Sequence, residues 1–236
     1  MVGMSELQAV FWDMDGTLVD TEPYWIESEY QLVKDHGGTW NEEKAHQLVG
    51  QALTYSASVL QEAGVQMGVR EIIDHLTAQV VSRCGERIPW RPGARDLLNE
   101  LHRERIRSAM VTMSFTPLAR AIAEALPTGH LEFVVTGDMV SAGKPDPEAY
   151  HLAFDTMAAD HEHRTGAPLR RRQCIAIEDS IPGTAAAAAS GMVTLAVPHY
   201  SPLPDNGQWH LMDTLSGAGV STLQELLVRD PSPATA

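Results

Sequence analysis

The strand-like segments of this chain fall into two groups, separated by a long stretch that contains none. Residues 7–12 form a short and almost continuously apolar run, a pattern typical of a strand buried on both faces of a parallel sheet. No other strand-like run appears between residues 19 and 89. Four helical patterns occupy that stretch instead, at residues 23–36, 41–48, 53–63 and 70–86. The first strand must therefore find its partners beyond residue 105.

Helix and strand patterns alternate after residue 93. The predicted helices are 93–104, 117–126, 147–159 and 182–190, and the predicted strands are 107–111, 131–135, 173–177 and 193–197. Such alternation favours right-handed βαβ units and a doubly wound parallel sheet. We therefore predict an α/β fold with a Rossmann-like core formed by residues 1–18 and 93–236, and an inserted all-α cap formed by residues 19–92.

The chain is acidic, with 31 Asp and Glu residues against 17 Lys and Arg residues and a formal net charge of -14. Such a charge repels nucleic acids and anionic membrane surfaces, and the densest basic run, at residues 170–172, is short. No apolar run approaches the ~18 residues that a bilayer span requires. We expect neither a nucleic-acid nor a membrane partner, and a monomer or a small homo-oligomer.

The cysteines and the N-terminal residues predict the cellular location. Cys84 and Cys174 lie far apart and outside any CxxC or Cys/His metal pattern, which suits a reducing compartment. Residues 1–8 lack the basic start and the long apolar stretch of a secretory signal. We therefore expect a cytoplasmic protein.

Polar side chains follow the predicted strands of the core at the points where those strands end. In chain order they are Asp13 and Asp15, then Thr112 with Met113 and Ser114, then Lys144, and finally Glu178 and Asp179. Ligands of an open α/β sheet bind at the carboxyl ends of its strands. We therefore expect these residues to meet in one crevice.

Several carboxylates in one crevice repel one another unless a cation lies among them. Hard oxygen ligands of this kind suit Mg²⁺, and a lysine at the same place suits a phosphate oxygen. Taken singly, each motif has a simpler interpretation, because a lone Asp-x-Asp or Glu-Asp pair is typical of a turn or a helix cap. The joint placement at strand ends favours the magnesium site. The His-Glu-His run at residues 161–163 we interpret as a solvated loop after a helix rather than as a second metal site.

Four segments resemble, in order, the four motifs of the haloacid dehalogenase superfamily. They are residues 13–20 (DMDGTLVD), 111–114 (VTMS), 143–147 (GKPDP) and 177–180 (IEDS). The helical cap inserted directly after the first motif extends the resemblance over nearly the whole chain. The continuation at residues 20–25 (DTEPYW) is similar to the branch that contains sugar-phosphate phosphatases and β-phosphoglucomutases.

The resemblance implies a covalent mechanism. Asp13 would attack phosphorus and form an aspartyl-phosphate, and Asp15 would protonate the leaving alcohol and then deprotonate the hydrolytic water. Mg²⁺ would be held by Asp13, by the backbone carbonyl of Asp15 and by Asp179, with Glu178 close by or bound through water. The transferring phosphoryl oxygens would be held by Thr112, the N–H of Met113 and Lys144, because charge neutralisation supplies most of the catalysis.

The cap residues bear on the choice among the branches of the superfamily. Dehalogenases that resemble this family lack the second aspartate, Asp15. By resemblance, β-phosphoglucomutases carry an Arg and a His where this chain has Leu53 and Trp25. We therefore expect a phosphatase that acts on a small phosphorylated substrate, with a phosphomutase and a non-catalytic binding protein as the alternatives. Trp25, Gln51 and Tyr55 are the predicted lining of the substrate pocket.

Overall fold

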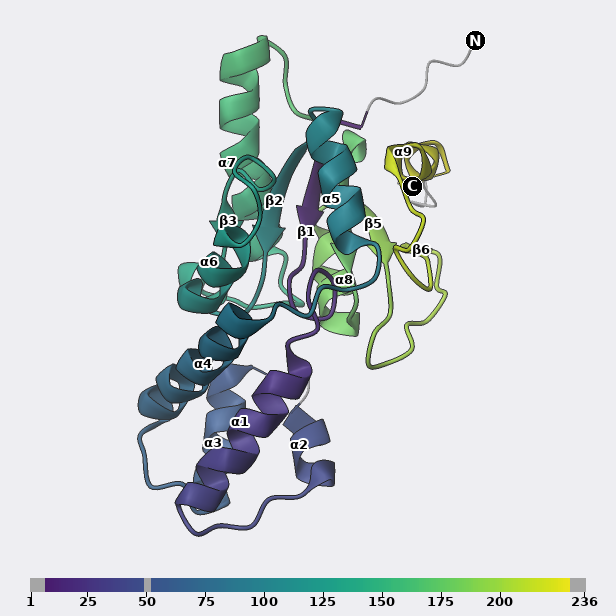
Figure 1. Cartoon of the computed structure of the whole chain (residues 1–236). Helices are drawn as coiled ribbons and strands as arrows, with labels where there is room; N and C mark the ends of the chain where they lie inside the picture. Colours follow the sequence, from purple (N-terminus) through teal and green to yellow (C-terminus); the bar gives the residue numbers. More distant parts are fainter. Residues whose placement is uncertain (1–6, 49–51, 230–236) are drawn as a thin grey trace.

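A single sheet of six parallel strands, in the order β3-β2-β1-β4-β5-β6, runs through the computed structural model, which describes residues 7–48 and 52–229 (Figure 1). The strands are β1 (Ala9–Trp12), β2 (Arg107–Val111), β3 (Val134–Val135), β4 (Cys174–Glu178), β5 (Val193–Ala196) and β6 (His210–Leu211). β1 pairs with both β2 and β4, so the strand that comes first in sequence lies in the interior of the sheet. All four of its residues are buried, which confirms the prediction made from its apolar run.

Helices cover both faces of the sheet. They are α5 (Ala94–Arg103), α6 (Thr116–Glu124), α7 (Glu148–Thr165), α8 (Ile181–Ala189) and α9 (Val220–Val228). Alternate residues of β1 face opposite sides, because side chains along a strand have a period of two. Val10 and Trp12 pack in one hydrophobic cluster with α5, α6 and α9, whereas Ala9 and Phe11 pack in another with α7 and α8. This three-layered arrangement confirms the predicted Rossmann-like α/β fold.

The stretch between β1 and α5 forms four helices and no strand among its described residues. It contains α1 (Glu22–Asp35), α2 (Glu42–Leu48), α3 (Leu53–Glu62) and α4 (Val69–Glu86), which lie together below the sheet in Figure 1. Leu32, Leu60 and Ile72 are among the apolar side chains that these helices bury fully or almost fully. None of the helices in the described part of the chain has the length and apolar character of a membrane span.

The chain crosses between the sheet and these four helices through two paired segments. Val19 and Trp90 form an antiparallel bridge, Asp20 N–H donates to Pro89 O at 2.8 Å, and Arg91 N–H donates to Leu18 O at 2.9 Å. Residues 18–20 and 89–91 therefore form a small hinge ladder. The division into a core (1–18 and 93–236) and a cap (19–92) stays a prediction that this connection supports.

Several predicted boundaries were wrong. The helix predicted at 147–159 continues to Thr165. It ends at Gly166, which has a φ of 70° and donates a backbone hydrogen bond to Glu162 O, so that Gly166 forms a left-handed C-cap. The His-Glu-His run at 161–163 is therefore helical rather than a loop. Of the strand predicted at 131–135, only Val134–Val135 form β3, although Glu132 N–H also donates to Ser108 O of β2 at 2.9 Å. The sequence patterns assigned no element to β6 or α9.

Candidate active site

Asp13, Thr112 and Glu178 lie at the carboxyl ends of three neighbouring strands, β1, β2 and β4, on the side that faces the four helices α1–α4 (Figure 1). Asp13 directly follows β1, Thr112 directly follows β2, and Glu178 ends β4. The parallel register aligns Trp12 with Met110 and with Ile177, so the residues that follow these positions emerge at the same edge of the sheet. The sheet thus brings together side chains from distant parts of the sequence.

A tight turn after β1 presents the first two aspartates. Gly16 N–H donates to Val19 O at 2.7 Å and Leu18 N–H donates to Met14 O at 2.9 Å, which closes the turn. Gly16 has a φ of 88°, and a Cβ atom there would lie 2.1 Å from Asp179 Oδ2. Only glycine satisfies both the backbone conformation and this close approach. The turn therefore packs the first motif directly against the fourth.

Lys144 connects the acids of two strands. Its Nζ lies 2.6 Å from Asp13 Oδ1 and 2.6 Å from Glu178 Oε1, and it donates to Val111 O at 2.9 Å. Burial lowers the pKa of Lys144, but the charges of Asp13 and Glu178 outweigh burial and hold that pKa above its ordinary value. Lys144 therefore stays cationic in the site.

Tyr150, on α7, completes the surroundings of Lys144. Its hydroxyl donates to Glu178 Oε1 at 2.7 Å, and its ring centroid lies 5.3 Å from Lys144 Nζ. We did not identify Tyr150 from the sequence, because a single tyrosine on an apolar helix face gives the same pattern as core packing. Tyr150 is fully buried, and its hydroxyl group holds Glu178 in place.

Three carboxyl groups lie close enough to share one metal ion. One oxygen each from Asp13, Glu178 and Asp179 lies within 4.8 Å of the others. Asp13 Oδ2 and Glu178 Oε2 are buried and accept no hydrogen bond from the described residues. Burial and the charge of Asp13 raise the pKa of Asp179 well above its ordinary value. This part of the site thus contains three carboxyl groups and a single lysine, and two of the buried carboxyl oxygens have no hydrogen-bond donor among the described residues. Such oxygens are suitable ligands for a hard divalent cation such as Mg²⁺.

Asp15 is held by three hydroxyl groups. Thr21 Oγ1 donates to its Oδ1 at 2.5 Å, and Ser114 Oγ and Thr112 Oγ1 donate to its Oδ2 at 2.7 and 3.2 Å. Burial raises the pKa of Asp15, the charge of Asp13 adds to that effect, and the hydroxyl donors oppose it. A raised pKa is what a carboxyl group needs in order to carry a proton to a leaving group. The roles of Thr21 and Ser114 were missed, although both belong to segments that the sequence had marked.

The second motif leaves one backbone donor available. Thr112 Oγ1 accepts from Ser114 N–H at 3.0 Å, and Met113 Sδ accepts from Lys144 N–H at 3.3 Å. Met113 N–H makes no hydrogen bond to any described residue. The side chain of Met113 therefore positions the Lys144 turn, while its amide is free to donate to an anion. Phosphate binding by Thr112, Met113 and Lys144 stays a prediction.

The predicted cap residues of the substrate pocket occupy different environments. Trp25 is only 9% exposed and packs in the main hydrophobic cluster, whereas Tyr55 on α3 is 54% exposed. Gln51 lies outside the described residues. Glu22, the first residue of α1, was not predicted as a site residue; burial and the charges of Asp15 and Asp20 raise its pKa to about 7. The lining of the substrate pocket thus stays a prediction.

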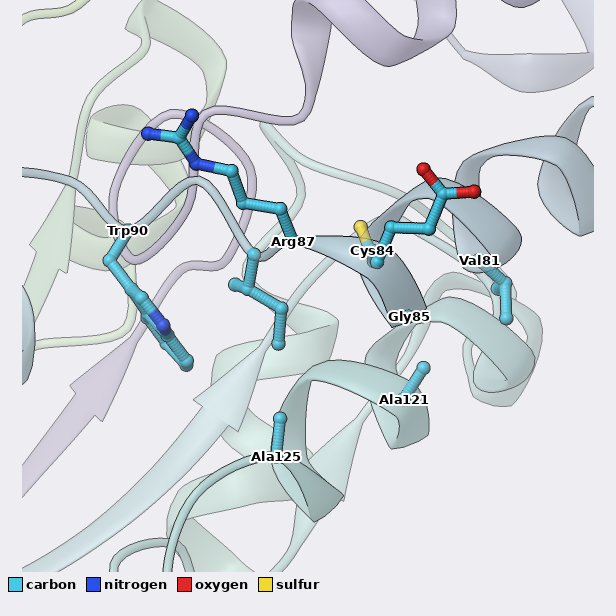
Figure 2. A pocket seen from close by; sticks show the side chains of 9 residues that line it. Val81, Cys84, Gly85, Arg87, Trp90, Ala121 and Ala125 are labelled. Carbon is cyan, nitrogen blue, oxygen red and sulfur yellow. The ribbon is translucent and has the colours of Figure 1, made fainter.

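A cavity of about 420 Å³ lies away from the acidic cluster, between the C-terminal turn of α4 and one side of α6. Figure 2 shows Ala121 of α6 and Ala125, the residue that follows α6, on one side of the cavity, and Cys84 and Trp90 on the opposite segment. None of the predicted site residues lines this cavity. We therefore place the reaction at the strand ends and not in this hollow.

Comparison with known proteins agrees with the geometry. The family model of the haloacid dehalogenase-like hydrolases matches residues 7–191. The chain is 28% identical over 194 residues to a phosphorylated carbohydrates phosphatase of Thermotoga maritima, which covers 79% of this chain and 82% of that protein. It is 29% identical over 188 residues to hexitol phosphatase A of Escherichia coli, covering 78% and 80% of the two chains.

Solved structures share the fold. The crystal structure of CbbY from Rhodobacter sphaeroides in complex with phosphate superimposes with a TM-score of 0.79 at 24% identity, over 92% of this chain and 99% of that chain. The family model spans all four motif segments that the sequence analysis identified, together with the helices between the first and the second. The chain therefore belongs to the haloacid dehalogenase-like hydrolases.

Proposed function

We propose that this hydrolase is a Mg²⁺-dependent phosphatase that cleaves the phosphate monoester of a small sugar phosphate through an aspartyl-phosphate intermediate. The observation that carries the proposal is the arrangement of Asp13, whose Oδ1 binds Lys144 while its buried Oδ2 accepts no hydrogen bond from the described residues. The phosphatases to which the chain is similar act, by their names, on phosphorylated carbohydrates and hexitols. A cytoplasmic location is part of the proposal, and the two free, buried cysteines are compatible with it.

The first half of the reaction transfers the phosphoryl group to the enzyme. A carboxylate oxygen of Asp13 attacks phosphorus, and the bond between phosphorus and the ester oxygen breaks. Asp15 donates its proton to that oxygen, so the product leaves as a neutral alcohol. Lys144 and the N–H of Met113 bind the phosphoryl oxygens as their charge is redistributed.

The second half regenerates the free enzyme. Asp15, now ionised, takes a proton from a water molecule that attacks the phosphorus of the aspartyl-phosphate. The bond between phosphorus and Asp13 breaks, and inorganic phosphate leaves. Bound Mg²⁺, held by Asp13, Asp179 and the Asp15 carbonyl with Glu178 nearby, would supply charge neutralisation between the anionic nucleophile and the substrate dianion.

The charges of the helical insertion favour a hydrolase over a phosphomutase. A mutase must bind a second phosphate away from the metal, which calls for free cations opposite the site. Arg70 Nε is paired with Asp74 Oδ1 at 2.9 Å, and Arg83 Nη1 with Glu27 Oε2 at 2.7 Å. Arg70 and Arg83 are therefore engaged, whereas Arg87 forms no ion pair within the described residues. Glu22 is a further acidic side chain near Asp15, and its pKa is raised to about 7 by burial and by the charges of Asp15 and Asp20.

Phosphate release from a panel of substrates tests the proposal. The panel contains hexose phosphates, hexitol phosphates, a nucleotide monophosphate and p-nitrophenyl phosphate, each measured with Mg²⁺ and with EDTA. We expect Mg²⁺-dependent phosphate release that prefers the carbohydrate phosphates. Formation of an isomerised sugar phosphate without free phosphate would instead identify a mutase.

A nucleophile variant tests the covalent step separately. We expect Asp13→Asn to lower the rate by at least about 10³-fold, as loss of a covalent nucleophile does in other enzymes. Full activity of this variant would exclude the aspartyl-phosphate. Unchanged far-ultraviolet circular dichroism is the control that the variant is folded.

A further inference from the structure

A loop of the sheet-containing part of the chain contacts the hinge ladder at one side chain. The loop follows β5, and its Tyr200 hydroxyl donates a short hydrogen bond to Asp20 Oδ1 across 180 residues of sequence. The ring of His199 packs against that of Tyr200 with the centroids 4.0 Å apart, and its Nε2 lies 3.1 Å from the same oxygen without forming a hydrogen bond. Burial and the adjacent Asp20 carboxylate raise the pKa of Tyr200, so its hydroxyl remains a donor.

Asp20 connects the Tyr200 contact with the candidate active site. Its N–H donates to Pro89 O at 2.8 Å, which joins the two segments of the hinge ladder. The next residue is Thr21, which donates to Asp15 Oδ1 at 2.5 Å. Of these two consecutive residues, Asp20 is held by the loop after β5, and Thr21 holds the proposed general acid, Asp15.

We propose that Tyr200, whose ring packs against His199, is a positioning residue for Asp15 and acts by anchoring Asp20 and thereby holding the Thr21 hydroxyl against the acid. Neither residue contacts the acidic cluster, and neither lies within the four motifs. The assignment rests on the proposed function, because it concerns the proton that Asp15 gives to the leaving alcohol. It also predicts a property of the hinge ladder that does not depend on activity.

Leaving-group dependence separates positioning of the acid from general damage. A sugar alcohol needs a proton as it leaves, whereas p-nitrophenolate is a stable anion that leaves without one. The ratio kcat/KM reports the steps up to the departure of the leaving group, so slow hydrolysis of the aspartyl-phosphate does not affect it. The carbohydrate substrate is glucose 6-phosphate, or whichever carbohydrate phosphate of the panel is cleaved fastest. We expect Tyr200→Phe to lower kcat/KM for this substrate by roughly 10-fold, which is only part of the rate enhancement that a general acid contributes. The value for p-nitrophenyl phosphate should stay nearly unchanged.

Two further variants complete the kinetic test. Asp20→Ala should reproduce the selective loss, and combining it with Tyr200→Phe should cause no further loss, because both remove the same contact. Tyr30→Phe is the matched control, since the Tyr30 hydroxyl makes no hydrogen bond to the described residues and should affect neither substrate. An equal loss on both substrates would assign Tyr200 a purely structural role and overturn the proposal.

Amide hydrogen exchange tests the anchor without reference to catalysis. The N–H groups of Asp20 and Arg91 pair across the hinge ladder. We expect Tyr200→Phe to accelerate their exchange by about 10-fold while amides of β4 stay protected, because local opening is a separate process from global unfolding. Unchanged exchange at the ladder would overturn the proposal even if the enzyme were active. A wild-type chain without phosphatase activity would refute the proposed function alone, and the exchange result would still decide whether the loop anchors the hinge.

Discussion

Lys144 Nζ lies 2.6 Å from Asp13 Oδ1, although the two residues are 131 positions apart in the sequence. The same nitrogen lies 2.6 Å from Glu178 Oε1, and the exposed fraction of the Lys144 side chain is only 5%. The lysine is thus enclosed between two buried carboxylates before any phosphate arrives. Its charge offsets the acids in the free enzyme, and under the proposed function it would also attract the substrate anion.

Replacing Lys144 by Met should therefore impair both stability and catalysis. Removal of one partner from a buried ion pair costs about 3–5 kcal/mol, because the remaining charge is left uncompensated. We expect a lower Tm in EDTA, a partial recovery of Tm with Mg²⁺, and loss of phosphate release. Thermal unfolding with and without the metal measures the first two effects. Lys34→Met, at an exposed position of α1, is the control and should change Tm little; an equal loss in both variants would contradict the ion-pair explanation.

Mg²⁺ should stabilise the folded chain through the acidic cluster. A ligand that binds only the folded state adds about 2.7 kcal/mol of stability at a hundredfold excess over its Kd. We expect Tm to rise with the concentration of Mg²⁺ in the wild type, and this rise to disappear in Asp179→Asn. The measurement requires no substrate. A rise that persists in the variant would place the metal elsewhere, and Asp213→Asn, in a loop apart from the cluster, serves as the control.

Two helical glycines provide a matched pair of variants. A Cβ atom at Gly183 of α8 would lie 1.9 Å from Glu178 Oε2, whereas one at Gly85 of α4 would meet nothing within 4 Å. Gly183→Ala should displace Glu178 and destabilise the fold by about 1–3 kcal/mol, the usual cost of overpacking. Gly85→Ala should instead stabilise it by up to about 1 kcal/mol, because alanine favours helix.

Chemical denaturation of both glycine variants measures these changes. Phosphate release should fall in Gly183→Ala and stay at the wild-type level in Gly85→Ala. Opposite signs of the two stability changes would support the close approach of α8 to Glu178. Similar signs would mean that helix propensity alone determines the effect.

The sequence predicted the site well where its residues follow strands. An apolar run identifies a buried strand, and the rule that parallel strands end at one edge then brings Asp13, Thr112 and Glu178 together. The inserted helices were predicted for a related reason, since the run at 7–12 had no partner before residue 105. These inferences need only the periodicity of apolar residues and the direction of the strands.

The remaining features depend on side-chain orientation, which periodicity does not specify. Thr21 and Ser114 lie beside predicted site residues, but only the fold shows that both hydroxyls reach Asp15. Tyr150 belongs to an apolar helix face whose pattern is typical of core packing, so the pattern does not show its contact with Glu178. The contact of Tyr200 with Asp20 joins segments that are 180 residues apart in the sequence. The end of α7 could have been placed correctly, because Gly166 is the first glycine after the predicted helix.

Glu29 predicts a pH dependence of stability that is independent of the active site. Glu29 lies within the helical insertion and is only 5% exposed, and its Oε2 accepts no hydrogen bond from the described residues. Burial, together with the charge of Glu22, raises the pKa of Glu29 from 4.5 to about 8. The folded chain therefore retains a proton that the unfolded chain loses near pH 4.5. Its contribution to stability is fully present below that pH and is lost as the pH rises towards 8, by up to about 1.4 kcal/mol per pH unit.

Glu29→Gln should remove this pH dependence, because the amide has the size of the protonated acid and does not ionise. We expect wild type and variant to have similar Tm values at pH 5, and the variant to be more stable at pH 8.5, by about 2–4 °C for each kcal/mol recovered. Thermal unfolding at several pH values measures the difference. Glu62→Gln, at an exposed position of α3, should leave the curve of the wild type unchanged. A constant difference between Glu29→Gln and wild type across this range would show that Glu29 is already ionised in the folded chain at pH 5.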